Sequence, residues 1–299
     1  MEEFEVTLND GTQMKGHYWP AKDARKNFVF ITGMDEHVSR YDEMFTYFNS
    51  LGINVWGLDA IGQGRNASSV EEQEQWPEGG FFKNVEGIHK AILLAKENGL
   101  PTVQGGHSMG SFLTQGRLET YPLDSEKTIL IGTNGGQKNL MKLGYFLSKV
   151  LVHKSNWNKP SPLLDRLSLD SYSKSVKNRN SDLDWLSYDE ENLKNYREDP
   201  YCGHKNSGGF WREFLRGVSG LWTKKNLNKI SKDERVYITA GAEDPVGQNG
   251  AGPRWLAKKY QELGLKEVKL KIYPKMRHEI HNETDRKMVW EDIATEILD

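Results

Sequence analysis

The chain contains the stretch Pro101-Thr102-Val103-Gln104-Gly105-Gly106-His107-Ser108-Met109-Gly110. Its last five residues fit the pattern G-x-S-x-G, in which a strained turn between a strand and a helix raises one serine hydroxyl clear of the backbone. Gly106 and Gly110 leave room for that turn, because a Cβ atom at either position would crowd the neighbouring helix or strand. The sequence therefore predicts Ser108 as a nucleophile, and a loop with an incidental serine is the alternative.

The residues on both sides of this pattern favour the strand–turn–helix interpretation. Before it, a short β-type run follows an expected helix end at Asn98-Gly99. After it, small and apolar residues have the spacing of a helix that lies close to a sheet: Phe112, Leu113, Gln115, Gly116 and Leu118. This context supports the turn at Ser108 more strongly than the five-residue pattern alone.

Length and composition limit the kind of protein. A chain of 299 residues suits one large α/β domain or two small ones. Lys and Arg total 40 against 42 Asp and Glu, so there is no basic excess to hold nucleic acid. A single cysteine, Cys202, excludes an internal disulfide framework and fits a reducing compartment.

The N-terminal residues and the hydropathy pattern bear on location. Residues 1–5 are acidic where a secretory signal would be basic and then apolar. No uncharged apolar run approaches the ~20 residues that a membrane-spanning helix needs. We therefore expect a cytoplasmic globular protein. Its oligomeric state is left open.

Strand-like and helix-like segments alternate on both sides of Ser108. The expected strands are residues 4–8, 14–19, 28–31, 53–58, 101–105, 128–131, 236–240 and 268–273. The expected helices are residues 39–49, 82–98, 253–263 and 283–298. This alternation predicts an α/β fold with a mostly parallel central sheet that helices cover on both faces.

One long interruption breaks the alternation after the sixth expected strand. Residues 134–230 are too many for a crossover and are rich in Lys, Asn, Ser and aromatic residues. We expect them to form a helical cap, or lid, over the carboxyl edge of the sheet, where open α/β sheets bind ligands. Residues 1–133 and 231–299 would then form the core. A separate small domain is the alternative for the interruption.

Ser108 requires a base, and the base requires an orienting acid. In a sheet of this kind the partners follow in the order serine, acid, histidine, at the ends of later strands. Asp244 follows the strand at 236–240 and is held by Pro245, so we predict it as the acid. The adjacent Glu243 is the alternative, but in an extended backbone it would point to the other side.

His278 follows the last expected strand and precedes the last helix, which is the expected place for the base. His281 is a weaker candidate because it lies nearer that helix. The remaining histidines precede the acid or lie within the G-x-S-x-G pattern: His17, His37, His89, His107, His153 and His204. We therefore predict Ser108, Asp244 and His278 as a catalytic triad.

An oxyanion hole needs two backbone N–H groups, one from the residue after the nucleophile and one from the loop after an early strand. Met109 would supply the first. Met34, in the loop after the strand at 28–31, would supply the second, although it is also compatible with an ordinary core position.

Four segments together resemble the α/β-hydrolases of the monoacylglycerol lipase, lysophospholipase and serine aminopeptidase-like family. Residues 32–41 are similar to that family's H-G-x-x-E-H-S-x-R-Y stretch, and residues 106–110 match its nucleophile turn. Residues 241–246 resemble its acid loop and residues 273–279 its histidine loop. The resemblance implies the α/β-hydrolase fold and the triad, and it leaves only the cap loosely matched.

The chain departs from the family pattern at two places. Thr32 stands where the family usually has a histidine that supports the oxyanion loop. Residues 59–64, Asp-Ala-Ile-Gly-Gln-Gly, lack the arginine and histidine of the family's D-x-R-G-H-G loop. These departures affect residues near the site and leave the predicted triad intact.

The resemblance implies a serine carboxylic-ester hydrolase that forms an acyl-enzyme at Ser108. The implied substrate is a medium or long acyl ester, such as a monoacylglycerol or a lysophospholipid. We expect no metal or organic cofactor, since Cys and His clusters at ligand spacing are absent and residues 132–136 lack the Lys-Ser/Thr of a phosphate loop.

The expected cap carries an apolar stripe that is compatible with an acyl substrate: Leu140, Met141, Leu143, Phe146, Leu147, Val150 and Leu151. The stripe is equally compatible with packing of the cap onto the core. A modest basic rim of Lys138, Lys142, Lys149 and Lys154 allows a transient contact with a membrane surface.

Two rival functions remain. A peptidase that releases N-terminal residues, also implied by the family, would need an acidic pocket for the α-amino group, with candidates Asp35, Glu36, Asp182, Asp184 and Asp189. A non-catalytic relative that binds an acyl ligand or a partner protein is the second rival, and only the departures at Thr32 and residues 59–64 support it.

Overall fold

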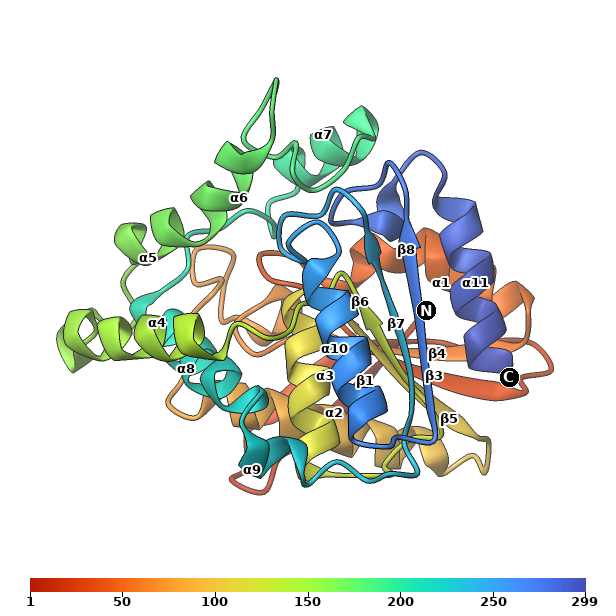
Figure 1. Cartoon of the computed structure of the whole chain (residues 1–299). Coiled ribbons are helices and arrows are strands. Elements are labelled where there is room, and N and C mark those ends of the chain that lie inside the picture. The colour runs from red at the N-terminus through yellow and green to blue at the C-terminus, as the bar shows by residue number, and fades with distance from the viewer.

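A central sheet of eight strands organises the molecule (Figure 1). The computed structural model describes all residues, 1–299. The strands are β1 Glu2–Thr7, β2 Gln13–Trp19, β3 Lys26–Ile31, β4 Ile53–Leu58, β5 Thr102–His107, β6 Thr128–Ile131, β7 Arg235–Gly241 and β8 Glu267–Tyr273. Their spatial order is β1-β2-β4-β3-β5-β6-β7-β8. β3 to β8 are mutually parallel and β1 and β2 form an antiparallel edge, so the predicted mostly parallel sheet is confirmed.

Helices cover both faces of the sheet. α1 (Asp42–Ser50) and α11 (Arg286–Leu298) share one apolar core with the sheet. α2 (Gly80–Lys96), α3 (Met109–Thr120) and α10 (Ala251–Glu262) share the other. Because both faces are covered, the central strands are buried, and β3 contains the continuous apolar run Phe28-Val29-Phe30-Ile31.

The expected elements are present, and the largest shifts of their first residues, three residues each, occur at two helices. The first expected helix begins as a 3₁₀ turn at Val38–Tyr41 before α1. The closing helix begins at Arg286 and not at 283. Glu283 has another role, because its carboxylate accepts the backbone N–H groups of Arg277 and Tyr188. This side chain fixes the loop that carries His278.

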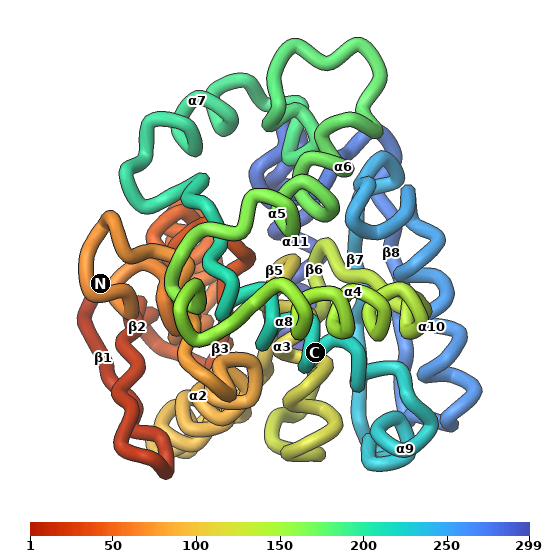
Figure 2. The backbone as a smooth tube through the Cα atoms, turned by 90° about the vertical axis from the view of Figure 1, so that its left-hand side faces the viewer, coloured from red at the N-terminus to blue at the C-terminus, as the bar shows by residue number.

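Six helices lie between β6 and β7 in the chain: α4 Lys138–Leu151, α5 Pro162–Leu167, α6 Leu169–Ser175, α7 Glu190–Glu198, α8 Gly208–Leu221 and α9 Lys224–Leu227. We call residues 134–230 the inserted segment. Figures 1 and 2 show α6 and α7 toward the end of the sheet to which β7 and β8 run. α8 is almost wholly buried and packs against α2, α3 and α4, so it joins the segment to the core.

α4 divides the predicted apolar stripe between two environments. Met141, Leu147 and Leu151 pack against the main core. The opposite side is exposed to solvent through Leu140, Leu143, Phe146 and Val150. Neither this helix nor any other in the structure has both the length and the apolar character needed to cross a membrane.

Candidate active site

Ser108 lies at the turn between β5 and α3 with a strained backbone, φ 50° and ψ −117°. Its N–H donates to the Ile131 carbonyl at 3.0 Å, which fixes the turn against β6. A Cβ atom on Gly106 would meet the Gly110 carbonyl oxygen at 2.5 Å, and one on Gly110 would meet the Thr32 carbonyl oxygen at 2.5 Å. Both glycines are therefore required by close backbone approach, as the sequence pattern predicts.

Asp244 and His278 form a buried pair. Asp244 Oδ1 lies 3.0 Å from His278 Nδ1 and also accepts the Val246 N–H at 2.8 Å. Burial disfavours the imidazolium, but the Asp244 carboxylate outweighs burial and raises the pKa of His278 above its ordinary value. The arrangement fixes the tautomer in which Nδ1 carries the proton and Nε2 is free to accept one.

His278 and Ser108 line the same cavity, which has a volume of about 60 Å³. No hydrogen bond joins the Ser108 hydroxyl to the imidazole in this structure, a separation common in unliganded sites. The inserted segment covers His278 directly. The Trp185 ring lies 5.2 Å from the imidazole, and the Trp185 and Leu186 carbonyls accept the N–H groups of His278 and Glu279.

The two alternative residues lie elsewhere. Glu243 is exposed, and its carboxylate accepts a hydrogen bond from the Tyr188 hydroxyl. His281 is buried and stacks on Tyr41 with ring centroids 4.8 Å apart. Burial and the neighbouring His107 hold the pKa of His281 well below its ordinary value. Neither residue joins the Asp244–His278 pair.

The loop after β3 brings a free N–H group to the cavity. The Gly33 N–H donates to Glu36 Oε1 at 2.7 Å, and Asp35 adopts the left-handed conformation with φ 61°. The Met34 N–H makes no hydrogen bond, and Met34 lines the cavity together with Met109, the first residue of α3. Helix N-terminal N–H groups lack partners within the helix. Both residues predicted for an oxyanion hole therefore line the cavity.

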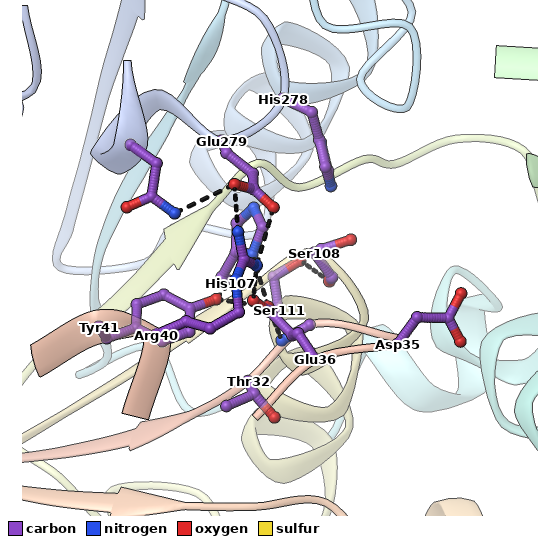
Figure 3. Close-up of polar contacts among 12 residues, drawn as sticks. Thr32, Asp35, Glu36, Arg40, Tyr41, His107, Ser108, Ser111, His278 and Glu279 are labelled. Atoms are coloured by element: carbon purple, nitrogen blue, oxygen red, sulfur yellow. Dashed lines mark hydrogen bonds and ion pairs between the residues drawn. The ribbon is translucent and has the colours of Figure 1, made fainter. Parts of the chain in front are cut away.

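A buried charge network, which the sequence reasoning did not assign, lies behind the site (Figure 3). Arg40 bonds both Glu279 oxygens, at 3.0 and 2.9 Å, and also pairs with Glu36. Glu36 in turn accepts from the Tyr41 hydroxyl and contacts His107. The network joins the oxyanion loop to the residue after His278. Its signal in the sequence was present in the Glu, Arg and Tyr of residues 32–41.

The two departures from the family pattern meet in space. The Thr32 hydroxyl lies 3.4 Å from Gln63 Oε1, and Gln63 Nε2 donates to Glu74 Oε1 at 2.7 Å. The same Glu74 oxygen accepts the Asp35 N–H at 3.1 Å. Thr32 and Gln63 therefore belong to one buried polar chain that reaches the oxyanion loop.

Of the five acids considered for an amino-group pocket, only Asp35 and Glu36 line the Ser108 cavity. Glu36 is paired with Arg40. Asp184 accepts from the backbone of residues 180 and 181, Asp189 caps α7, and Asp182 is exposed.

Two groups of side chains have three metal-ligand atoms within 4.8 Å of one another. One is His37, Asp199 and Cys202, where His37 and Asp199 already bond each other at 2.8 Å. The other is Glu267, Glu296 and Asp299, which surrounds the Lys127 ammonium. Neither group includes a residue of the predicted triad.

Comparison with known proteins identifies the family of the chain. Residues 22–285 match the family described as serine aminopeptidase, S33. The chain belongs to this family. The predicted family resemblance is therefore confirmed, and with it the assignment to the hydrolases.

Several proteins that are similar to this chain are named as lipases or esterases. A monoacylglycerol lipase of Mycolicibacterium smegmatis is 26% identical over 286 residues, which cover 93% of this chain and 90% of that protein. A monoglyceride lipase homolog of monkeypox virus is 25% identical and covers 94% and 92% of the two chains. A thermostable carboxyl esterase of Bacillus coagulans, solved in complex with glycerol, has a TM-score of 0.90 with 25% identity over both whole chains. These similarities confirm the predicted α/β-hydrolase fold.

Proposed function

We propose that the protein is a serine carboxylic-ester hydrolase that works through an acyl-enzyme at Ser108. The observation that carries the proposal is the buried Asp244–His278 pair beside a serine held in a strained turn. Ser108 Oγ attacks the acyl carbonyl carbon, and His278 Nε2 takes its proton and returns it to the leaving alcohol. Asp244 holds the imidazole and stabilises the imidazolium. Water then hydrolyses the acyl-enzyme by the same steps.

The N–H groups of Met34 and Met109 would hold the oxyanion. Both lie at the cavity, and the Met34 N–H has no competing acceptor. Preorganised backbone donors of this kind stabilise the charge that develops on the carbonyl oxygen, and each typically contributes about 10²–10³-fold to the rate. The Glu36–Gly33 hydrogen bond supports the proposal because it fixes the loop that presents Met34.

We propose a medium or long acyl ester, of the monoacylglycerol or lysophospholipid kind, as the substrate. Apolar side chains contribute to the lining of the cavity, among them Phe112, Phe214 and Val246. The cavity of about 60 Å³ holds only about four water molecules, so the acyl chain must displace covering side chains such as Leu169 and Tyr172. Those covering residues belong to the inserted segment, which we propose to be the cap.

The exposed face of α4 supports a further part of this proposal. Leu140, Leu143, Phe146 and Val150 give the inserted segment an apolar surface with lysines at its rim. Such a face suits transient contact with aggregated acyl substrate or a membrane surface.

Hydrolysis of a chain-length panel of acyl esters and monoacylglycerols, with an aminoacyl amide included, tests the function. Ser108→Ala should lower kcat by about 10⁶-fold, because the nucleophile and its base act as a unit. A fluorophosphonate probe should label the parent protein at Ser108 and leave the variant unlabelled. Cleavage of the amide alone would replace the esterase by the peptidase, and an unlabelled serine without turnover would leave a binding protein.

A further inference from the structure

Asp35 is held in place by its backbone and not by its side chain. Its N–H donates to Glu74, and its carbonyl accepts from the Tyr196 hydroxyl and the Gly203 N–H, each at 3.0 Å. The carboxyl group has one long hydrogen bond, from Asn206 Nδ2 to Oδ2 at 3.4 Å, and Oδ1 has no partner. The residue is only 6% exposed.

The side chain therefore works against stability. A left-handed φ of 61° is strained for any residue with a Cβ atom, although Asp tolerates it better than most. A buried oxygen without a hydrogen-bond partner is also unfavourable. Glycine would relieve both and keep all three backbone bonds. A carboxyl group at this position thus calls for an explanation outside the folded chain itself.

The surroundings of Asp35 contain more acceptors than donors. Glu74 Oε2, Asp165 Oδ2 and Asn206 Oδ1 are also buried without partners. Burial, together with the Asp165 charge, raises the pKa of Asp35 well above its usual range, and burial together with Asp35 does the same for Glu74. A neutral carboxylic acid both donates and accepts, so it suits a neutral hydroxyl better than an ammonium ion.

Asp35 lines the Ser108 cavity. With Leu169, Trp185 and Tyr196 it forms the wall between that cavity and a second groove of about 340 Å³. The groove is lined by polar and charged side chains, among them Asp165, Asp170, Lys174, Arg179, Asp182 and Lys205. Figure 3 shows Asp35 pointing away from the Glu36–Arg40–His107 network. The apolar residues Phe112, Phe214 and Val246 also line the Ser108 cavity.

We propose that Asp35 is a specificity-determining residue whose carboxyl group hydrogen-bonds a free hydroxyl on the alcohol part of the ester. The acyl chain lies among the apolar residues, and the alcohol lies toward Asp35 and the polar groove. The protein then selects esters of hydroxylated alcohols over esters of simple alcohols. This inference rests on the proposed hydrolysis at Ser108.

The test compares two substrates that differ only in the hydroxyl groups, 1-octanoylglycerol and propyl octanoate. In Asp35→Gly the ratio of their kcat/KM values should fall about tenfold, the value of one buried hydrogen bond of about 1.4 kcal/mol. The melting temperature should rise at the same time, because strain and an unpaired oxygen are removed. Asp35→Asn, which keeps one acceptor and tolerates a left-handed φ, should lose less of the preference.

Asp23→Gly is the matched control, since Asp23 also has a positive φ, 55°, and is exposed in the loop before β3. It should leave the substrate ratio unchanged. An unchanged ratio in both Asp35 variants would overturn the inference and leave water as the partner of Oδ1. So would a lower melting temperature in Asp35→Gly alone, since the side chain would then be structural. An Asp35-dependent preference for the 2-aminoethyl ester would replace the hydroxyl by an ammonium ion.

A binding measurement separates this inference from the proposed function. In Ser108→Ala, 1-O-octylglycerol should bind more tightly than octyl propyl ether. Adding Asp35→Gly to this variant should reduce the ratio of the two binding affinities about tenfold. Loss of this difference without any Ser108-dependent hydrolysis would place a hydroxyl-binding site on a protein that is not an esterase. Hydrolysis at Ser108 with equal binding of the two ethers would overturn the role of Asp35 alone.

Discussion

Two adjacent carboxylic acids, Asp35 and Glu36, are buried beside Ser108 with opposite properties. Glu36 accepts from the Gly33 N–H and the Tyr41 hydroxyl and pairs with Arg40. Burial alone would raise its pKa, but Arg40 and His107 outweigh burial and lower the pKa of Glu36 to about 2. Asp35 has one long hydrogen bond and no cation in contact, and its pKa is raised well above the usual range.

The comparison shows that donors, and not depth, decide whether a buried carboxyl group keeps its charge. Both side chains are almost wholly buried. The Glu36 carboxylate has hydrogen-bond donors and a cation as partners. Through Arg40 it is linked to Glu279, the residue after His278. The Asp35 carboxyl group has one oxygen without a hydrogen-bond partner, and the residue lines the cavity. Glu36 therefore maintains the geometry of the site, while the Asp35 carboxyl group is available to a ligand.

Removal of the Arg40 guanidinium, the cation that pairs with Glu36, should have the largest effect on the free energy of unfolding. Arg40→Met leaves Glu36 and Glu279 buried without their partner, which should reduce the free energy of unfolding by about 3–5 kcal/mol. Urea unfolding monitored by tryptophan fluorescence measures the change. Arg286→Met is the control, because Arg286 pairs with Glu43 and Asp189 near the surface and should contribute only about 0–1 kcal/mol. Equal losses in the two variants would contradict the importance of the buried pairing.

The contributions of Glu36 and Asp35 to the free energy of unfolding should change in opposite directions with pH. Glu36 has a lowered pKa in the folded state, so its stabilisation is present above its ordinary value of 4.5 and is lost as the pH falls toward about 2. The shift corresponds to about 3 kcal/mol. Asp35 has a raised pKa, so its contribution is present below its ordinary value of 3.8 and is lost as the pH rises through the folded value.

Urea unfolding at a series of pH values measures both effects. Glu36→Gln should flatten the acid limb of the stability curve between pH 4.5 and about 2. Asp35→Asn should become progressively more stable than the parent protein as the pH rises above 3.8. A curve that flattens in the same direction for both variants would show that the two residues do not differ as described.

The parts of the site that sequence could predict are those fixed by the ends of strands. Ser108, Asp244 and His278 follow β5, β7 and β8, whose carboxyl ends meet at one edge of a parallel sheet. Their positions after these strands were therefore enough to predict that the three residues lie near one another. Some strands could be found because burial on both faces favours continuous apolar runs, as in Phe28–Ile31 of β3.

The rest depends on contacts between distant parts of the chain. Arg40 and Glu279 are 239 residues apart, and only the folded chain brings the guanidinium to the histidine loop. The difference between Asp35 and Glu36 follows from the partners that the fold brings to each side chain, Arg40 to Glu36 and Asn206 to Asp35. The near-complete burial of α8 likewise depends on α2, α3 and α4 packing around it.

The smallest effect is expected where the polar chain from Asp35 ends, at Thr32. Its hydroxyl lies 3.4 Å from Gln63 Oε1, too long for a strong hydrogen bond, while the Gln63 amide has a better partner in Glu74. Thr32→Val should therefore change the free energy of unfolding by only about 0.5 kcal/mol and should leave ester hydrolysis almost unaltered. Thr133→Val is the control, since the equally buried Thr133 hydroxyl lies 2.8 Å from the Ser111 hydroxyl and 3.0 Å from Gln115 Nε2. That variant should lose about 1–3 kcal/mol, because one buried N–H of Gln115 Nε2 is left without its acceptor. A loss at Thr32 as large as that at Thr133 would show that Thr32 supports the oxyanion loop in place of the family histidine.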